Sequence, residues 1–407
     1  MSRVRSATAR PVYDSRGRPT IEVRIEADSG AVGIAAAPSG ASTGTHEVDA
    51  FPAGGVPTAL QTFGRVVAPA LLGADLADGA GFDARLHAAD GTPRFARIGG
   101  NTATATSIAA ARALAAETGR ELWEVWRRPG VPGDVFPAIV GNCLNGGRHA
   151  IGGPEIQEFL AFAPEARPDD AVRVALAVHG AVGAALRARF PSLALGRGDE
   201  GGWVAPVGNL EALELFASAC TKASDELHLH VYPGLDLAAS EFFSEGRYTY
   251  RERSYDAEGH VAFLADLVDR FGIRYLEDPF DQEDFASFAA LTESVGSRTL
   301  VVGDDLYATS RSRLERGVAE RSSNAILIKV NQVGTLSDTF ETVDLARSHG
   351  LATVTSHRSG DLPDGWLAHL AVATAAAGLK CGLLGGERVA KLNELLRLGA
   401  RQRSTTG

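Results

Sequence analysis

The chain has 407 residues, a formal net charge of −10 and 45% hydrophobic residues. This length fits a β/α barrel with a smaller companion domain, and the composition is that of an ordinary soluble globular protein. The negative charge argues against nucleic acid or an anionic membrane as the main partner, although local cations can still bind an anionic substrate. The start of the chain has no apolar signal segment, and no run of about 18 apolar residues occurs. We therefore predict a cytoplasmic protein without a membrane span.

The first part of the chain predicts an α+β domain. Residues 10–34 alternate between apolar and polar, as antiparallel strands with one exposed face do, and residues 58–126 have helical periodicity. The loop Ser39-Gly40-Ala41-Ser42-Thr43-Gly44 between them is either a plain linker or a mobile lid that brings a hydroxyl onto a metal. The Pro- and Gly-rich stretch 127–133 is the candidate linker. We expect an N-terminal α+β capping domain at residues 1–130 and a barrel domain at residues 131–407.

Apolar runs that end in a charged residue follow one another in the second part. Continuous apolar runs are typical of parallel strands covered on both faces. In an α/β barrel of this kind, the catalytic groups lie at the C-terminal ends of different strands. We therefore predict one active site assembled from successive strands. The residues at or just after these strand ends are Asp236, Glu277, Asp304, Lys329, His357 and Arg358.

Three of these residues, Asp236, Glu277 and Asp304, are carboxylates, which suit an octahedral oxygen-ligated ion such as Mg²⁺. Each could instead cap the helix that follows it, as aspartate often does. Their position at successive strand ends, with Lys329 and Lys380 after them, favours the metal.

Lysine is rare in this chain, with residues 222, 329, 380 and 391 as its only occurrences among 40 basic residues. Unlike arginine, lysine can lose its proton near neutral pH, as a general base must. Lys329 at a strand end is therefore the candidate base.

Glu158 interrupts an apolar strand, where burying an unpaired carboxylate costs several kcal/mol. Glu158 is therefore either an acid with a raised pKa or the partner of an arginine. His149 could be a ligand or an ordinary loop histidine. The sequence His357-Arg358-Ser359 can bind a phosphate through charge-assisted hydrogen bonds.

Along its whole length the chain resembles the enolase (phosphopyruvate hydratase) family. The matching motifs span Asp14 to Gly17, Ser39 to Gly44, Asn145 to Gly147, Gln157 to Phe159, Gly198 to Gly202, Ser240 to Phe242, Glu277 to Phe280, Gly303 to Leu306, Lys329 to Gln332, Ser356 to Gly360 and Ala390 to Asn393. The resemblance implies an enolase-type β/α barrel with an N-terminal cap, acting on a small phosphorylated anion.

The resemblance also implies roles for individual residues. Asp236, Glu277 and Asp304 would hold a first Mg²⁺, and Ser42 would join a second, substrate-dependent one. Lys329 would be the base, and Glu200, supported by Glu158, the acid that helps the 3-hydroxyl leave; the enolase superfamily is itself a known example of a Lys or His base with one or two Mg²⁺ ions. Glu22 and Arg397 match positions that pair across the family's dimer interface, so we expect a homodimer. The substrate-binding residues would be His149, Gln157, His357, Arg358, Ser359 and Lys380.

Three loops depart from the family pattern: Val48 to Pro52, Ala150 to Gly153, and Cys381 to Gly386, which is one residue shorter. An unchanged chemical centre with altered loops favours a specialised paralogue, carboxyphosphonoenolpyruvate synthase, which uses 2-phosphoglycerate and phosphonoformate in phosphonate biosynthesis. The alternatives are a glycolytic enolase that converts 2-phosphoglycerate to phosphoenolpyruvate and a non-catalytic scaffold protein. The retained Lys329 and Lys380 argue against the scaffold.

Overall fold

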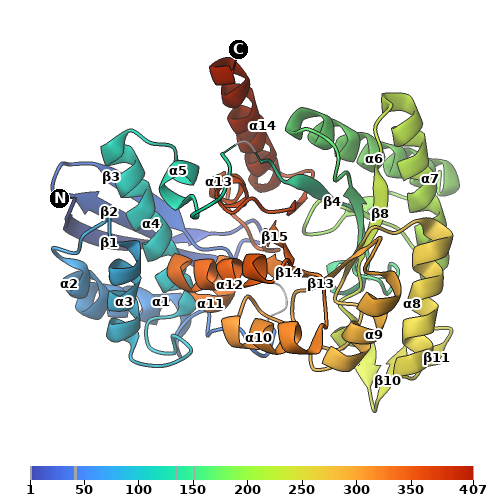
Figure 1. Cartoon of the computed structure of the whole chain (residues 1–407), viewed down its shortest axis with the longest axis horizontal. Helices are drawn as coiled ribbons and strands as arrows, with labels where there is room; N and C mark the ends of the chain where they lie inside the picture. The colour runs from blue at the N-terminus through green and yellow to red at the C-terminus, as the bar shows by residue number, and fades with distance from the viewer. Residues whose placement is uncertain (1, 41–43, 134, 151, 407) are drawn as a thin grey trace.

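The computed structural model describes residues 2–40, 44–133, 135–150 and 152–406. Its N-terminal part is a three-stranded antiparallel sheet in the order β1-β2-β3, covered by helices (Figure 1). Ile21, Val23 and Ile25 point to the covered face and are fully buried, as the alternating pattern predicts. Gly33 lets a helix approach closely, because a Cβ there would lie 1.9 Å from the carbonyl oxygen of Ala109. The elements are β1 (Val4–Tyr13), β2 (Pro19–Ala27), β3 (Val32–Ala36), α1 (Gly55–Thr62), η1 (Phe63–Val67), α2 (Ala68–Leu71), α3 (Gly79–Asp90), α4 (Gly100–Thr118) and α5 (Leu122–Trp126).

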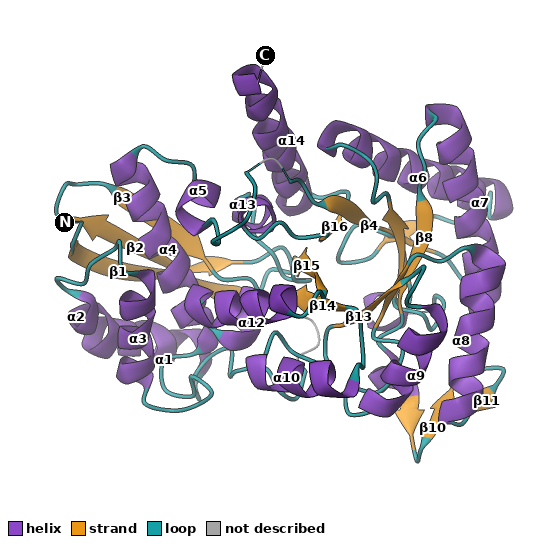
Figure 2. Cartoon of the chain, in the orientation of Figure 1, coloured by secondary structure: helices purple, strands orange, loops and turns teal. Residues whose placement is uncertain are grey.

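The remainder of the chain forms a closed eight-stranded barrel, seen on the right of Figure 2. Pairing of its last strand with its first closes the barrel. Apolar side chains such as Val140, Leu160, Val302 and Leu327 fill its interior. In order around the barrel, the strands are β4 (Ala138–Asn145), β5 (Glu158–Phe162), β8 (Tyr232–Asp236), β12 (Tyr275–Glu277), β13 (Leu300–Gly303), β14 (Ala325–Ile328), β15 (Ala352–Ser356) and β16 (Gly378–Gly382).

Helices and short strand pairs surround the barrel. The helices are α6 (Pro168–Arg189), α7 (Asn209–Leu227), α8 (Ala257–Phe271), α9 (Phe285–Val295), α10 (Arg311–Glu320), α11 (Val330–Val333), α12 (Leu336–Ser348), α13 (Trp366–Ala373) and α14 (Gly386–Thr406), with short helices η2 (Gly147–His149) and η3 (Ala239–Phe242). The remaining strands are β6 (Gly196–Arg197), β7 (Trp203–Val204), β9 (Phe243–Ser244), β10 (Arg247–Thr249) and β11 (Ser254–Tyr255).

One strand departs from the regular alternation of parallel strands and helices that the sequence predicts. β5 is antiparallel to both of its neighbours, β4 and β8, while the other adjacent strands of the barrel are parallel. Consequently the start of β5, not its end, lies at the barrel mouth where the other strands finish. Glu158, the first residue of β5, pairs in register with Asp236, the last residue of β8. The antiparallel direction is what brings Glu158 to the site.

Helix α6 is the one described helix that is long and apolar enough to cross a membrane. Half of its most apolar window is buried, and it packs against α7 and β4 as an outer helix of the barrel. This is weak support for a membrane span. The three cysteines, Cys143, Cys220 and Cys381, are buried free thiols, in keeping with their scattered positions in the sequence.

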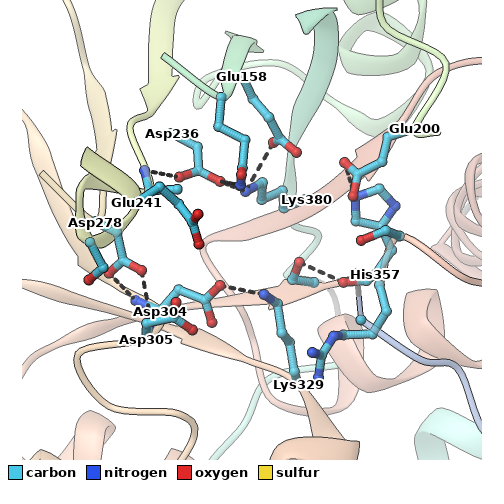
Figure 3. Close-up of a pocket in the computed structure, with 17 residues that line it drawn as sticks. Glu158, Glu200, Asp236, Glu241, Asp278, Asp304, Asp305, Lys329, His357 and Lys380 are labelled. Atoms are coloured by element: carbon cyan, nitrogen blue, oxygen red, sulfur yellow. Dashed lines mark hydrogen bonds and ion pairs between the residues drawn. The ribbon is translucent and has the colours of Figure 1, made fainter. Parts of the chain in front are cut away.

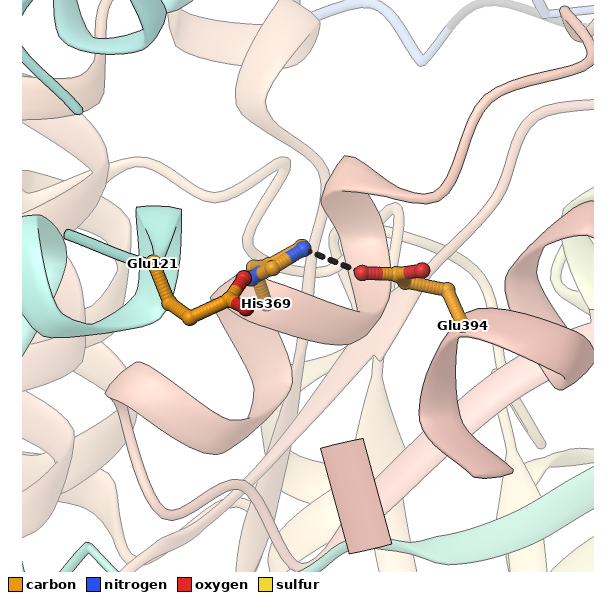
Figure 4. A group of neighbouring side chains, drawn as sticks. All are labelled: Glu121, His369 and Glu394. Atoms are coloured by element: carbon orange, nitrogen blue, oxygen red, sulfur yellow. Dashed lines mark ion pairs between the residues drawn. The ribbon is translucent and has the colours of Figure 1, made fainter. Parts of the chain in front are cut away.

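A cluster of His369, Glu121 and Glu394 joins the N-terminal part to the barrel part (Figure 4). The Trp123 backbone N–H donates to His369 Nδ1 at 3.2 Å, so the neutral ring carries its hydrogen on Nε2, which lies 2.6 Å from Glu394 Oε1. Arg397 donates to both oxygens of Glu121 at 2.9 and 2.8 Å. Both ring nitrogens are engaged and the carboxylates are neutralised, so this cluster fits an ion-pair network better than a metal site.

Candidate active site

A cavity at the barrel mouth carries an excess of carboxyl groups (Figure 3). Among the described residues, seven carboxyl side chains line it against three permanent cations. The carboxyl groups belong to Glu158, Glu200, Asp236, Glu241, Asp278, Asp304 and Asp305, and the cations to Lys329, Arg358 and Lys380. Such an imbalance in a buried site favours the binding of additional positive charge.

Lys380, from β16, lies among three carboxylates. Its Nζ is 2.7 Å from Glu277 Oε1, 2.9 Å from Asp236 Oδ2 and 3.0 Å from Glu158 Oε2. Burial alone would lower the pKa of Lys380, but the three carboxylates together raise it well above its usual value. The register β5-β8-β12 brings these carboxylates side by side, because Glu158, Asp236 and Glu277 are cross-strand neighbours.

Lys329 follows β14 and contacts Asp304, which follows β13. Burial opposes the charge on Lys329, and the Asp304 carboxylate outweighs that effect and raises the pKa of the lysine. The same ion pair keeps the pKa of Asp304 low despite its burial. Gln332 Nε2 also donates to Asp304 Oδ1 at 3.0 Å. Lys329 is therefore protonated in this arrangement, and it can act as a base only once Asp304 is engaged elsewhere.

The donor set at the mouth fits a hard divalent cation. Oxygens of Asp278, Asp304 and Asp305 lie within 4.8 Å of one another. Burial and the neighbouring Asp304 charge raise the pKa of Asp305 to about 7. Burial and Asp236 likewise raise the pKa of Glu277 well above its usual value. Carboxylates crowded in this way are destabilised without a cation, and oxygen ligands are those that Mg²⁺ prefers.

The structure divides the predicted ligand set between two lysines. Asp236 and Glu277 face Lys380, whereas Asp304 faces Lys329. The closest carboxylate group instead contains Asp278, whose two oxygens accept the backbone N–H groups of Asp304 and Asp305 at 2.9 and 2.8 Å. Ser42, the predicted ligand of a second ion, lies outside the described residues.

Glu200 and His357 form a second buried pair on another side of the cavity (Figure 3). His357 Nε2 lies 3.0 Å from Glu200 Oε2, and Asn142 Nδ2 donates to the same oxygen at 3.2 Å. Burial lowers the pKa of His357 to about 4, and nearby Arg388 also lowers it, against the opposing effect of Glu200. The imidazole is therefore neutral at physiological pH.

The other predicted substrate-binding residues are placed as follows. Arg358 is buried and donates to both oxygens of Glu47 at 3.0 Å, and to Asn331 Oδ1 at 2.8 Å. Ser359 and Gln157 line the cavity, and Gln157 Nε2 lies 3.4 Å from Asp236 Oδ2. His149 ends η2, close in sequence to the end of β4, and its side chain is outside what the structure describes.

Sequence reasoning missed Glu47, Asn331, Asp278 and Arg388. Glu47 lies three residues after the end of the Ser39 to Gly44 loop, and this nearness was the available signal for it. Asn331 lies in the motif that begins at Lys329, and Asp278 in the one that begins at Glu277. Arg388 lies inside a helical segment with no local sign of a role at the site.

Two of the altered loops contribute no described residue to the cavity lining, although the Gly382 backbone N–H of one of them donates to the cavity-lining His357 at 3.4 Å. Leu383 is fully buried in the apolar core. Its side chain packs so closely on Gly141 that a Cβ added to that glycine would lie 2.9 Å from it. The backbone N–H of Val48 donates to Gln332 O at 2.9 Å, and its side chain packs near Gly100. Neither Val48 nor Leu383 is among the described residues that line the cavity. Ile151, in the third loop, lies outside the described residues.

Comparison with protein families assigns both parts of the chain. Residues 4–125 match the enolase N-terminal domain, and residues 134–405 match the enolase C-terminal TIM barrel domain. The chain belongs to the enolase family. It is an enolase-family lyase with the predicted capped-barrel fold.

Curated relatives agree over nearly the full length. The enolase of Natronomonas pharaonis is 43% identical over 403 residues, covering 98% of this chain and 100% of that protein. The enolase of Methanocorpusculum labreanum is 43% identical over 406 residues, covering 98% and 99%. The enolase of Methanothermobacter thermautotrophicus is 42% identical over 401 residues, covering 97% and 96%. These names favour the glycolytic alternative over the phosphonate paralogue that the altered loops suggested.

Proposed function

We propose that the protein is a Mg²⁺-dependent phosphopyruvate hydratase, which removes water from 2-phosphoglycerate to give phosphoenolpyruvate. The observation that carries the proposal is the separation of Lys329 from the Glu200–His357 pair, on different sides of one acidic cavity (Figure 3). A dehydration of this kind needs a base for the α-proton and an acid for the departing hydroxyl.

Lys329 is the proposed base. It removes the α-proton, and the electrons of the broken C–H bond move into the substrate carboxylate. In a second step these electrons form the C=C bond as the C3–O bond breaks. In the present arrangement the Asp304 carboxylate keeps Lys329 charged. Engagement of Asp304 by a metal would weaken that pairing and lower the pKa of the lysine toward the range that a base requires.

Glu200 is the proposed acid, supported by Glu158. It gives a proton to the leaving 3-hydroxyl, which departs as water. Asn142 and His357, which face one oxygen of Glu200, hold the carboxyl group in place.

Asp236, Glu277 and Asp304 are the proposed ligands of one Mg²⁺, and Ser42 of a second. Bound Mg²⁺ supplies positive charge beside the substrate carboxylate, which gains charge when its α-proton is lost. Lys380, Arg358, Ser359, Gln157 and His149 are the proposed contacts to the substrate phosphate and carboxylate. The buried Lys380 and Arg358 supply the cations that such an anion needs. The predicted contact through His357 is not part of this proposal, because its two ring nitrogens face Arg388 and Glu200.

We also propose the oligomeric state, the domain limits and the cellular location. Within the chain, Glu22 accepts from Arg10 at 2.5 Å and Arg397 binds Glu121, so both residues of the proposed dimer contact are already in ion pairs. A homodimer would exchange or extend these pairs. We place the cap at residues 1–130, the barrel at residues 131–407 and the protein in the cytoplasm.

Isotope exchange separates the two candidate reactions. With Mg²⁺ and 2-phosphoglycerate in deuterated water, a phosphopyruvate hydratase forms phosphoenolpyruvate and also exchanges the α-proton. Exchange without dehydration, followed by a new product when phosphonoformate is added, would instead indicate the phosphonate paralogue. A folded protein that does neither would be the scaffold.

A further inference from the structure

Arg388, in α14, is a fully buried arginine whose hydrogen bonds converge on the segment around His357. Its Nη1 donates to the backbone oxygen of Arg358 at 2.6 Å and lies 3.2 Å from Asp361 Oδ2. Its Nη2 donates to the backbone oxygen of Ser359 at 2.6 Å. These contacts hold the guanidinium in one orientation.

The same guanidinium contacts the imidazole of His357. Arg388 Nη1 lies 2.7 Å from His357 Nδ1, and the Gly382 backbone N–H donates to that nitrogen from 3.4 Å. A guanidinium stays protonated in proteins and has no acceptor atom, so it can only donate here. Nδ1 must then carry a lone pair, and the neutral ring carries its hydrogen on Nε2.

We infer that Arg388 is a positioning residue, whose guanidinium fixes the Nε2–H tautomer of His357 and thereby keeps the protonated ring nitrogen beside the Glu200 carboxyl group. His357 Nε2 faces Glu200 Oε2 at 3.0 Å, and Asn142 donates to that same oxygen. Asn142 Nδ2 and the hydrogen-bearing nitrogen of His357 therefore both lie beside Oε2 of Glu200. The contacts from Arg388 through His357 to Glu200 thus determine which polar groups surround this carboxyl group.

The tautomer itself is tested without reference to activity. Histidine labelled with ¹⁵N in the ring gives separate signals for Nδ1 and Nε2, and the His357 signals among the ten histidines are assigned by their loss in a His357→Gln variant. In the wild-type protein we expect Nδ1 as an acceptor and Nε2 protonated near neutral pH. A protonated Nδ1 in the wild type would overturn the inference directly.

The Arg388→Met variant removes the donor, and Arg388→Lys retains one. In Arg388→Met we expect the Nδ1 signal to move toward the protonated position as the Nδ1–H tautomer becomes populated, and in Arg388→Lys we expect the wild-type pattern. Arg388→Gln serves the same purpose if the methionine variant does not fold, because a neutral amide can accept as well as donate. A wild-type tautomer in a folded Met or Gln variant would overturn the inference.

Lys391 provides a matched control. It is a buried cation on the same helix, lies 3.1 Å from the same Asp361 carboxylate oxygen, and donates to the backbone oxygens of Leu362 and Asp364. Among the described residues, none of its hydrogen bonds or ion pairs is with His357. Lys391→Met therefore reports the cost of losing a buried cation, and we expect its His357 signals to match the wild type. A tautomer change in this control as large as that in Arg388→Met would show that the effect is general loosening.

The kinetic consequence rests on the proposed function and is measured separately. In Arg388→Met, dehydration should slow by about 10- to 100-fold, within the range of general acid catalysis, while α-proton exchange by Lys329 changes much less. Equal slowing of both steps would refute the link to Glu200. If wild-type protein shows the expected tautomer but no dehydration, the proposed function fails and the assignment of Arg388 stands.

Discussion

Replacing Lys380 by methionine removes the cation that three buried carboxylates share. The three oxygens lie 2.7 to 3.0 Å from Nζ, and the lysine is only 4% exposed. Removing one partner of a buried ion pair costs about 3–5 kcal/mol, because the remaining charge is left uncompensated. With three carboxylates affected, we expect a loss of free energy of unfolding near the upper end of that range in metal-free buffer.

Added Mg²⁺ should restore part of the free energy of unfolding that Lys380→Met loses. Mg²⁺ at about 100 times its dissociation constant stabilises a folded protein by about 2.7 kcal/mol. In Lys380→Met the metal no longer competes with an ammonium group for Asp236 and Glu277, so it should bind more tightly. Each tenfold gain in affinity adds about 1.4 kcal/mol to the stabilisation.

The assay is urea unfolding followed by circular dichroism, with EDTA or with excess Mg²⁺, for the wild type and the variant. Lys222→Met is the control, because Lys222 is 62% exposed and lies 3.8 Å from Glu226; such a surface change is expected to alter stability by about 0.5 kcal/mol or less. Stability of Lys380→Met equal to or above that of Lys222→Met without metal would contradict the shared pairing of Lys380 with the three carboxylates. Weaker stabilisation by Mg²⁺ in Lys380→Met than in the wild type would contradict the predicted competition between Lys380 and the metal.

Three further predictions address the base, the acid and the acid stability of the fold. Lys329→Ala should abolish α-proton exchange, while Mg²⁺ should still stabilise the folded variant. Exchange at the wild-type rate would show that Lys329 is not the base. Glu200→Gln should retain exchange and lose dehydration by about 10²- to 10⁴-fold, measured as phosphoenolpyruvate formed, and undiminished dehydration would remove Glu200 as the acid. Burial lowers the pKa of His260 to about 3, so its neutral form stabilises the fold fully above the unfolded pKa near 6.5, and this contribution declines as the pH falls toward 3. Between pH 6.5 and 4.5 the wild type should lose about 2–3 kcal/mol of free energy of unfolding through this residue. The His260→Gln variant, which keeps a hydrogen-bonding partner for the Tyr250 hydroxyl, should lose less. An equal fall of the urea midpoint in both proteins over this pH range would contradict the prediction.

The strands that end in charge were predictable because burial on both faces requires a continuous apolar run. β13 (Leu300–Gly303) and β14 (Ala325–Ile328) coincide with the two runs seen in the sequence. The antiparallel direction of β5 is less evident, because its residues read as a buried strand in either direction. The segment between β4 and β5 forms no described α-helix, and the lack of a crossover helix there is the physical reason for the reversed direction.

The contacts that complete the site are long-range and leave no local pattern. Glu47 and Arg358 are 311 residues apart in sequence, and Arg388 and His357 are 31 apart on different elements. Nothing in the composition of either segment specifies its partner. The division of the carboxylates between Lys329 and Lys380 likewise depends on side-chain packing in three dimensions. The sequence places Leu383 close to Lys380, but it does not show that the Leu383 side chain lies in the apolar core instead of the cavity lining.

The most direct test of the central claim is product formation from 2-phosphoglycerate by the purified protein with Mg²⁺, with and without phosphonoformate. A phosphopyruvate hydratase forms phosphoenolpyruvate in both cases, at a rate that EDTA abolishes. Absence of phosphoenolpyruvate from folded, Mg²⁺-loaded protein would contradict the account, and a product that requires phosphonoformate would replace it with the phosphonate reaction.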